Sequence, residues 1–225
     1  MRPLKWGESI AKIVQVPLFY QENINESTRL AVWKIEEQEA FFTDTVTIQR
    51  TILHPHKRLQ HLAGRYLLSF LFPRFPSWLI RIAGTRKPFL EGQPYQFSIS
   101  HSDDYAAAIV STACSVGIDV ELRSPKVTAI RRKFLSDQDA GVLLAGADDA
   151  QTELRLTIAW SAKEAVYKWW GLGEVNFKED IIFNTHKISG EEGQLDCTFN
   201  KPAPRPVQVY YRLFGSLVLA WVVKA

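Results

Sequence analysis

The chain has 225 residues, of which 46% are hydrophobic and 12% aromatic, enough to bury the core of one large domain or of two small ones. Lys and Arg (27) exceed Asp and Glu (24) by only three. This charge suits a small anionic ligand and argues against a polycationic nucleic-acid binder.

The cysteines and the apolar runs exclude further classes. Cys114 and Cys197 lie far apart and outside any CxxC pair, which argues against a disulfide framework and a thiolate zinc site. Apolar runs such as residues 217–223 are far shorter than the roughly 20 residues of a membrane-spanning helix. Glu8 and Lys12 interrupt the apolar stretch that a secretory signal requires. We therefore expect a cytoplasmic protein without a membrane segment.

The N-terminal half is predicted to contain two helices followed by a small sheet. Residues 25–42 have helical spacing of large side chains, and residues 55–72 repeat that spacing with a longer apolar face. After a stretch punctuated by Pro and Gly, three segments alternate or run apolar like strands. These segments are residues 95–100, 105–111 and 115–121.

The C-terminal half repeats the order of helix, helix and strands. Ser136 followed by Asp139 is typical of a helix N-terminus, and residues 154–170 have helical periodicity until Gly171. Strand character returns after Val175 and continues through residues 207–213 and 217–223. The sequence therefore predicts an α+β protein in two similar halves, residues 1–122 and 123–225.

Two acids share one side of the strand predicted at residues 115–121. Asp119 and Glu121 alternate with apolar residues, so a strand buries one row and presents both carboxylates on the other. Oxygen ligands of this kind suit Mg²⁺, which commonly takes one or two carboxylates together with phosphate oxygens and water. The same alternation is also typical of an ordinary solvated strand face.

The predicted helix at residues 154–170 carries the segment WSAKEAVYK (160–168). Glu164 and Lys168 lie on one face of it, at i and i+4. Two interpretations remain open. The residues form either a surface ion pair worth about 0.3–0.5 kcal/mol, or a third metal-binding carboxylate beside an ammonium group that binds phosphate.

Hydroxyl and basic groups elsewhere are candidates for binding phosphate. In FSISHS (97–102), Ser100 and His101 stand at the end of a predicted strand, where a loop can offer backbone and side-chain donors. Further basic candidates are Arg58, His61 and Arg65, which form a stripe on the helix at 55–72, and Lys87 in a constrained loop. A structural histidine, a solvated stripe and an exposed lysine are the ordinary alternatives.

In this order, FSISHS, GIDVE (117–121) and WSAKEAVYK resemble the signature segments of the 4'-phosphopantetheinyl transferases, specifically the longer, single-chain kind that activates surfactin synthetase and serves carrier proteins broadly. The resemblance runs from about Arg58 to Lys168. It is specific because chance rarely places GIDVE about 40 residues before WSAKEAVYK, with FSISHS preceding both. It implies two similar α/β lobes related by pseudo-two-fold symmetry, an active site at their interface, and a monomer.

The resemblance also implies a reaction and a set of residues. The enzyme would transfer 4'-phosphopantetheine from coenzyme A to a serine of an apo acyl or peptidyl carrier protein, with Mg²⁺, and release 3',5'-ADP. Asp119, Glu121 and Glu164 would bind magnesium. The residues that would meet coenzyme A are Arg58, Arg65, Lys87, Ser100, His101 and Lys168. The catalytic residues would be Glu164, Lys168 and His101, with Glu164 as general base, directly or through a water that Glu121 could hold instead.

Two positions depart from the family's pattern. Arg86 stands where the family often has Gly before the lysine of its KP motif, and Asp139 stands where Glu is usual. Neither belongs to the metal set. They concern the adenine contacts around Lys87 and the start of the helix near Ser136.

An acidic carrier protein would be steered by a basic rim, for which the candidates are Arg123, Lys126, Arg131, Arg132 and Lys133; the same run is also typical of a solvated helix end. A catalytically inactive module that binds coenzyme A or a carrier protein is the main alternative function. A metal-dependent phosphatase or nuclease is another, although the chain lacks the strong basic tract expected of a nucleic-acid partner.

Overall fold

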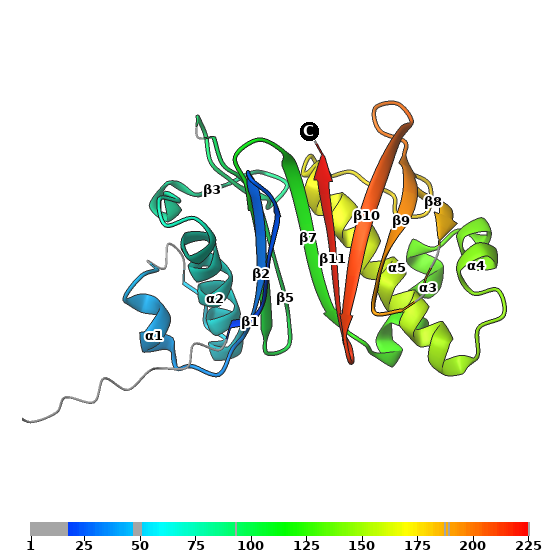
Figure 1. Cartoon of the computed structure of the whole chain (residues 1–225), viewed down its shortest axis with the longest axis horizontal. Coiled ribbons are helices and arrows are strands. Elements are labelled where there is room, and N and C mark those ends of the chain that lie inside the picture. Colours follow the sequence, from blue (N-terminus) through cyan, green and yellow to red (C-terminus); the bar gives the residue numbers. More distant parts are fainter. Residues whose placement is uncertain (1–17, 47–50, 93, 187, 189, 225) are drawn as a thin grey trace, which may run out of the picture.

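Two antiparallel sheets stand next to each other between helices in the computed structural model of the chain (Figure 1). The structure describes residues 18–46, 51–92, 94–186, 188 and 190–224. Within this part of the chain, no helix is long and apolar enough to cross a membrane.

The first sheet has the strand order β1-β2-β6-β5. Its strands are β1 (Leu18–Asn25), β2 (Thr28–Lys34), β5 (Gln96–Ser102) and β6 (Tyr105–Ser111). Two helices accompany it, α1 (Glu39–Thr43) and α2 (Pro55–Leu71). A 3-10 turn, η1 (Ser77–Leu79), and a small ribbon of β3 (Arg81–Ile82) and β4 (Pro88–Phe89) connect α2 to β5.

The second sheet has the strand order β7-β11-β10-β9-β8. Its strands are β7 (Ser115–Leu122), β8 (Ile181–His186), β9 (Glu192–Phe199), β10 (Arg205–Phe214) and β11 (Leu217–Lys224). Its helices are α3 (Pro125–Phe134), α4 (Asp137–Leu143) and α5 (Asp149–Trp170).

Three hydrophobic cores separate four layers. One core lies between α2 and the first sheet, and another lies between α5 and the second sheet. The third joins the two sheets, with Leu30 and Ile109 on one side and Ile118 and Leu219 on the other. Figure 1 shows the same order, with α2 and α5 on opposite outer faces of the paired sheets. The two sheets are therefore held together by apolar burial of their facing sides.

The helix predicted at residues 25–42 is wrong, because most of that segment is a hairpin end and a strand. β2 is buried on both faces: Leu30 and Val32 point to the core between the sheets, while Ala31 and Trp33 point to α2. A strand buried on both sides reads as a continuous apolar run without alternation, which periodicity alone does not distinguish from a helix. β1 before it was not predicted.

The other elements that were predicted from the sequence are present in the structure. The Ser136 hydroxyl caps α4 by accepting the backbone N–H of Asp139, and α5 ends at Gly171, whose φ of 71° places it in the left-handed region. α5 begins earlier than predicted because Asp148 and Gln151 form a capping box. The mixture of helices and antiparallel sheets confirms the expected combination of α and β structure. The pseudo-two-fold relation and the division at residue 122 stay predictions.

Candidate active site

Gly117 determines how closely α5 lies on β7. A Cβ atom at this position would stand 2.1 Å from the backbone oxygen of Ala165 and 2.5 Å from the backbone nitrogen of Trp169. Only a residue without a side chain allows this approach. Because Gly117 and Asp119 lie on the same side of the strand, the approach also brings α5 over the carboxylates of β7.

A row of serines on β5 joins the two sheets at their edges. The hydroxyls of Ser98 and Ser102 accept hydrogen bonds from the backbone N–H groups of Ile118 and Leu122, both at 3.2 Å. β7 pairs with β11 on its other side, so these hydroxyls satisfy donors on an edge that no strand covers. The motif FSISHS therefore has a structural role along its even-numbered positions.

The same serines hold the acids of β7. Ser100 Oγ donates to Asp119 Oδ1 at 2.8 Å, and Ser102 Oγ donates to Glu121 Oε1 at 3.1 Å. Lys168 Nζ lies 2.6 Å from Asp119 Oδ1 and 2.8 Å from Ser100 Oγ. The ion pair of Lys168 thus joins α5 to β7 and is not the local pair with Glu164 that helical spacing alone suggests.

Asp119 has one oxygen that no described residue satisfies. Its side chain is buried, and Oδ2 has no hydrogen-bond partner within the described part of the chain. A buried carboxylate oxygen without a partner is costly, and a cation or a donor from a ligand removes this cost. The position of Oδ2 therefore fits a metal ion.

Glu164 and Glu121 repel Asp119. Burial, followed by the charge of Asp119, raises the pKa of Glu164 to about 7 even though Lys168 opposes the shift. Burial and Asp119 likewise raise the pKa of Glu121. Three carboxylates that disfavour one another's charge form an all-oxygen donor set that suits Mg²⁺.

The three acids are not drawn tightly together. Among the described residues, the group whose ligand atoms all lie within 4.8 Å of one another is a different one, made of His56 from α2 and of Asp103 and Asp104 from the turn after β5. The ammonium group of Lys168 neutralises the negative charge of Asp119, which a bound metal ion would also do. The arrangement fits a divalent cation by its donor chemistry and by the free Oδ2.

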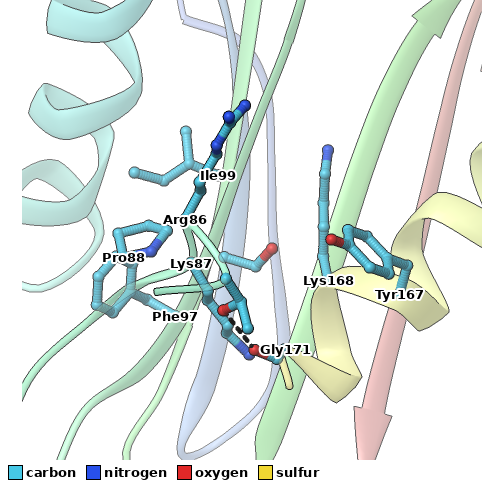
Figure 2. A pocket seen from close by; sticks show the side chains of 10 residues that line it. Arg86, Lys87, Pro88, Phe97, Ile99, Tyr167, Lys168 and Gly171 are labelled. Atoms are coloured by element: carbon cyan, nitrogen blue, oxygen red, sulfur yellow. Dashed lines mark hydrogen bonds between the residues drawn. The ribbon is translucent and has the colours of Figure 1, made fainter. Parts of the chain in front are cut away.

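A cavity of about 280 Å³, here called the cleft cavity, lies between the β3–β4 ribbon, β5 and the end of α5. Phe97, Ile99 and Tyr167 give it apolar walls, and Lys87 and Lys168 supply two ammonium groups (Figure 2). Lys87 Nζ donates to the backbone oxygen of Trp169 at 3.2 Å, near the negative end of the helix dipole. Burial lowers the pKa of Lys87.

A second cavity of about 540 Å³, the basic cavity, adjoins the first, since both are lined by Arg86, Pro88 and Ile99. The basic groups that line it are Lys57, His61, Arg65, Arg86 and His101, and none of the carboxylates in the described part of the chain lines it. Burial and the charge of Lys168 lower the pKa of His101. A cavity lined in this way attracts a polyanion.

The structure brings together most of the residues predicted from sequence. Arg65, Lys87, Ser100 and His101 line or border the two cavities. Arg58 is the exception, because its guanidinium forms a salt bridge with Glu39 of α1 at 2.7 Å and lines neither cavity.

Two basic residues of the site were missed. Lys57 lies four residues before His61 and eight before Arg65, a spacing that places the three on one face of α2, but the stripe predicted from the sequence contained Arg58 instead. Arg86 was noted only as a departure from the family's glycine.

Lys163, next to the glutamate of WSAKEAVYK, belongs to the core. Its side chain is fully buried, and Nζ lies 2.6 Å from Asp139 Oδ2 and also donates to the backbone oxygens of Phe177 and Ile181. Asp139 Oδ1 in turn accepts the backbone N–H of Phe183. The shorter Asp139, where the family usually has Glu, thus ties α4, α5 and β8 together.

The basic run after β7 divides into two parts. Arg123 is held by Glu153 at 2.8 Å and by the backbone oxygen of Ala150, both from α5. The exposed basic groups are Lys126, Arg131, Arg132 and Lys133 on α3. Three of them lie in its last turn, where the helix dipole favours positive charge.

Comparisons with known proteins agree with this geometry. The sequence model of the 4'-phosphopantetheinyl transferase superfamily matches residues 115–222, which include β7 and α5. Enterobactin synthase component D of Salmonella austin is 34% identical over 112 residues, 50% of this chain and 47% of that protein. The 4'-phosphopantetheinyl transferase AcpT of Escherichia coli K12 is 31% identical over 117 residues, 51% of this chain and 59% of that protein.

The match therefore spans about half the length of these curated relatives, and about half of this chain. It contains Asp119, Glu121, Glu164 and Lys168, whose charges act on one another in the structure. Residues 115–222 of the chain are thus similar to the 4'-phosphopantetheinyl transferase superfamily.

Proposed function

We propose that this chain transfers the 4'-phosphopantetheine group of coenzyme A to a serine of an apo acyl or peptidyl carrier protein, in a reaction that depends on Mg²⁺. The observation that supports this best is the free, buried Oδ2 of Asp119 beside Lys168, at the border of a cleft rich in cations. The superfamily match over the same residues supports it as well.

Asp119, Glu121 and Glu164 would hold the magnesium ion. A bound Mg²⁺ supplies charge neutralisation for the pyrophosphate of coenzyme A. The raised pKa values of Glu164 and Glu121 support this assignment, because a nearby cation would relieve the repulsion that causes them.

The chain's own residues would carry the proton and spread the charge. The acceptor serine Oγ forms a bond to the β-phosphorus of coenzyme A, the bond from that phosphorus to the bridging oxygen breaks, and 3',5'-ADP leaves with the electron pair. Glu164 accepts the serine proton, directly or through a water. Lys168 and His101 stabilise the charge that develops on the phosphate oxygens.

The two cavities divide coenzyme A between them in this proposal. The basic cavity receives the phosphorylated nucleotide end, with Arg65 and His101 as contacts. Lys87 and Lys168 line the cleft cavity, between the nucleotide end of coenzyme A and the carboxylates of β7 and α5. The active site would then lie at the interface between halves 1–122 and 123–225, related by a pseudo-two-fold axis.

We propose α3 as the approach side for the carrier protein. Its exposed basic groups would attract an acidic partner and raise the rate of encounter. In this proposal the protein acts as a cytoplasmic monomer, because one chain supplies both halves of the site, and it takes no nucleic-acid partner.

Intact-mass spectrometry of a purified apo acyl carrier protein, incubated with this protein, coenzyme A and Mg²⁺, tests the proposal. The expected result is a gain of one phosphopantetheine mass that EDTA suppresses and that Lys168→Ala abolishes. A carrier protein that stays unmodified while coenzyme A still binds would favour the inactive binding module. Transfer that is unaffected by EDTA would refute the role of Mg²⁺.

A further inference from the structure

Arg86 has a backbone conformation that favours glycine. Its φ angle is 69°, in the left-handed region that a residue with a Cβ atom rarely adopts. The ribbon fixes this conformation, because Ala83 N–H donates to the Lys87 oxygen and Arg86 N–H donates to the Ala83 oxygen, both at 2.9 Å. The glycine common in the family at this position has a physical reason here, and arginine keeps the turn at a cost in stability.

The side chain of Arg86 has no structural partner that explains this cost. It is exposed, and no hydrogen bond or salt bridge joins its guanidinium to another described residue. Lys87, its neighbour in the chain, turns the other way, toward the end of α5 (Figure 2). Strain kept without a compensating contact is typical of a functional position.

The guanidinium lies where the two cavities meet. Arg86 lines both of them, and Figure 2 shows its side chain extending along the cleft on the side opposite Lys168. A planar guanidinium binds a phosphate through two parallel hydrogen bonds, which a lysine does not reproduce. In the basic cavity it would join Lys57, Arg65 and His101.

We propose that Arg86 is a specificity-determining residue that binds the 3'-phosphate of the coenzyme A nucleotide and so separates coenzyme A from its 3'-dephospho form. The inference rests on the proposed function, since it assigns the basic cavity to that nucleotide. It goes further by giving this chain a phosphate contact that a glycine at the same position would lack. The strained turn is the cost of this discrimination.

Isothermal titration of the full chain with 3',5'-ADP and, separately, with 5'-AMP, which lacks only the 3'-phosphate, tests the proposal. Arg86→Gly is expected to lose about ten-fold or more of the affinity for 3',5'-ADP, because a hydrogen bond to a charged group typically contributes that much. The affinity for 5'-AMP should change less than two-fold. The urea midpoint of Arg86→Gly should rise, because glycine relieves the turn.

Glu174→Gly is the matched control. Glu174 also has a positive φ, 52°, and lines neither cavity, so this variant should raise the urea midpoint and leave both affinities unchanged. Equal binding of 3',5'-ADP by wild type and Arg86→Gly would overturn the role of Arg86, and equal losses for both nucleotides would overturn its assignment to the 3'-phosphate. Wild type that binds neither nucleotide would overturn the proposed function itself.

Discussion

Replacing Glu164 by Gln removes one of the mutually repelling carboxylates of the site. In the folded protein the pKa of Glu164 is about 7, against an ordinary value of 4.5. A folded-state pKa above the unfolded one means that the stability contribution is complete below pH 4.5 and is lost as the pH rises through 7. Each pKa unit corresponds to about 1.4 kcal/mol, so the loss reaches about 3 kcal/mol as an upper bound, since solvent reaches part of the side chain.

Urea denaturation in EDTA between pH 5.5 and pH 8 measures this effect. Glu164→Gln should gain free energy of unfolding relative to wild type as the pH rises, and the difference should level off above pH 7. Titrating groups far from Glu164 cancel in the difference between the two proteins, whereas the relief of the repulsion on Glu121 adds to it. Glu179→Gln, which changes an exposed carboxylate outside the site, should show no such trend. Parallel curves for wild type and Glu164→Gln would refute charge crowding at the site.

Three further substitutions probe the framework of the site. Lys163→Met leaves Asp139 buried without its cation and should cost about 3–5 kcal/mol in urea denaturation; a cost below 1 kcal/mol would contradict the buried pair. Gly117→Ala places a methyl group 2.1 Å from the Ala165 oxygen and should lower the free energy of unfolding by about 3 kcal/mol or more. It should also weaken the binding of coenzyme A in titration calorimetry. Unchanged binding would show that the site does not require α5 to lie this close to β7. Ser100→Ala removes the hydroxyl shared by Asp119 and Lys168 and should lower the free energy of unfolding by about 1 kcal/mol. The loss in kcat/KM for transfer, expressed as a free energy, should be larger than this. A loss in kcat/KM smaller than the loss in stability would make the role of the serine purely structural.

The sequence predicted the central strands and helices because their patterns have local causes. Residues 55–72 present one apolar face to one core, and Ser136 and Gly171 mark helix ends by hydrogen bonding and backbone conformation. The strand β2 was not predicted because both of its faces are buried. This burial results from the packing of two sheets, and it removes the alternation of apolar and polar residues by which a strand is recognised in a sequence. β1 went unrecognised together with its partner.

The residues of the site likewise divide into those that local sequence patterns predict and those that only the fold brings together. The alternation of Asp119 and Glu121 with apolar residues predicted that both carboxylates lie on one side of β7. The ion-pair partner of Lys168 was not predictable in this way. Helical spacing indicated Glu164, whereas in the folded protein Lys168 pairs with Asp119. Lys163 is adjacent to Glu164 in the motif yet points into the core, and only the buried position of Asp139 explains it. Arg86 was visible as an oddity, and its φ angle gives the physical reason.

The serine row and the core between the sheets bear on how this protein can be divided. A fragment starting at Ser115 would contain β7, α5 and the residues that match the superfamily. It would also leave the Ile118 and Leu122 amides of β7 uncapped, and the apolar side of β7 and β11 open to water. Such an edge and face together invite strand-to-strand association between copies. The region that matches the superfamily model therefore depends on the N-terminal half to cover its free strand edge and its apolar face.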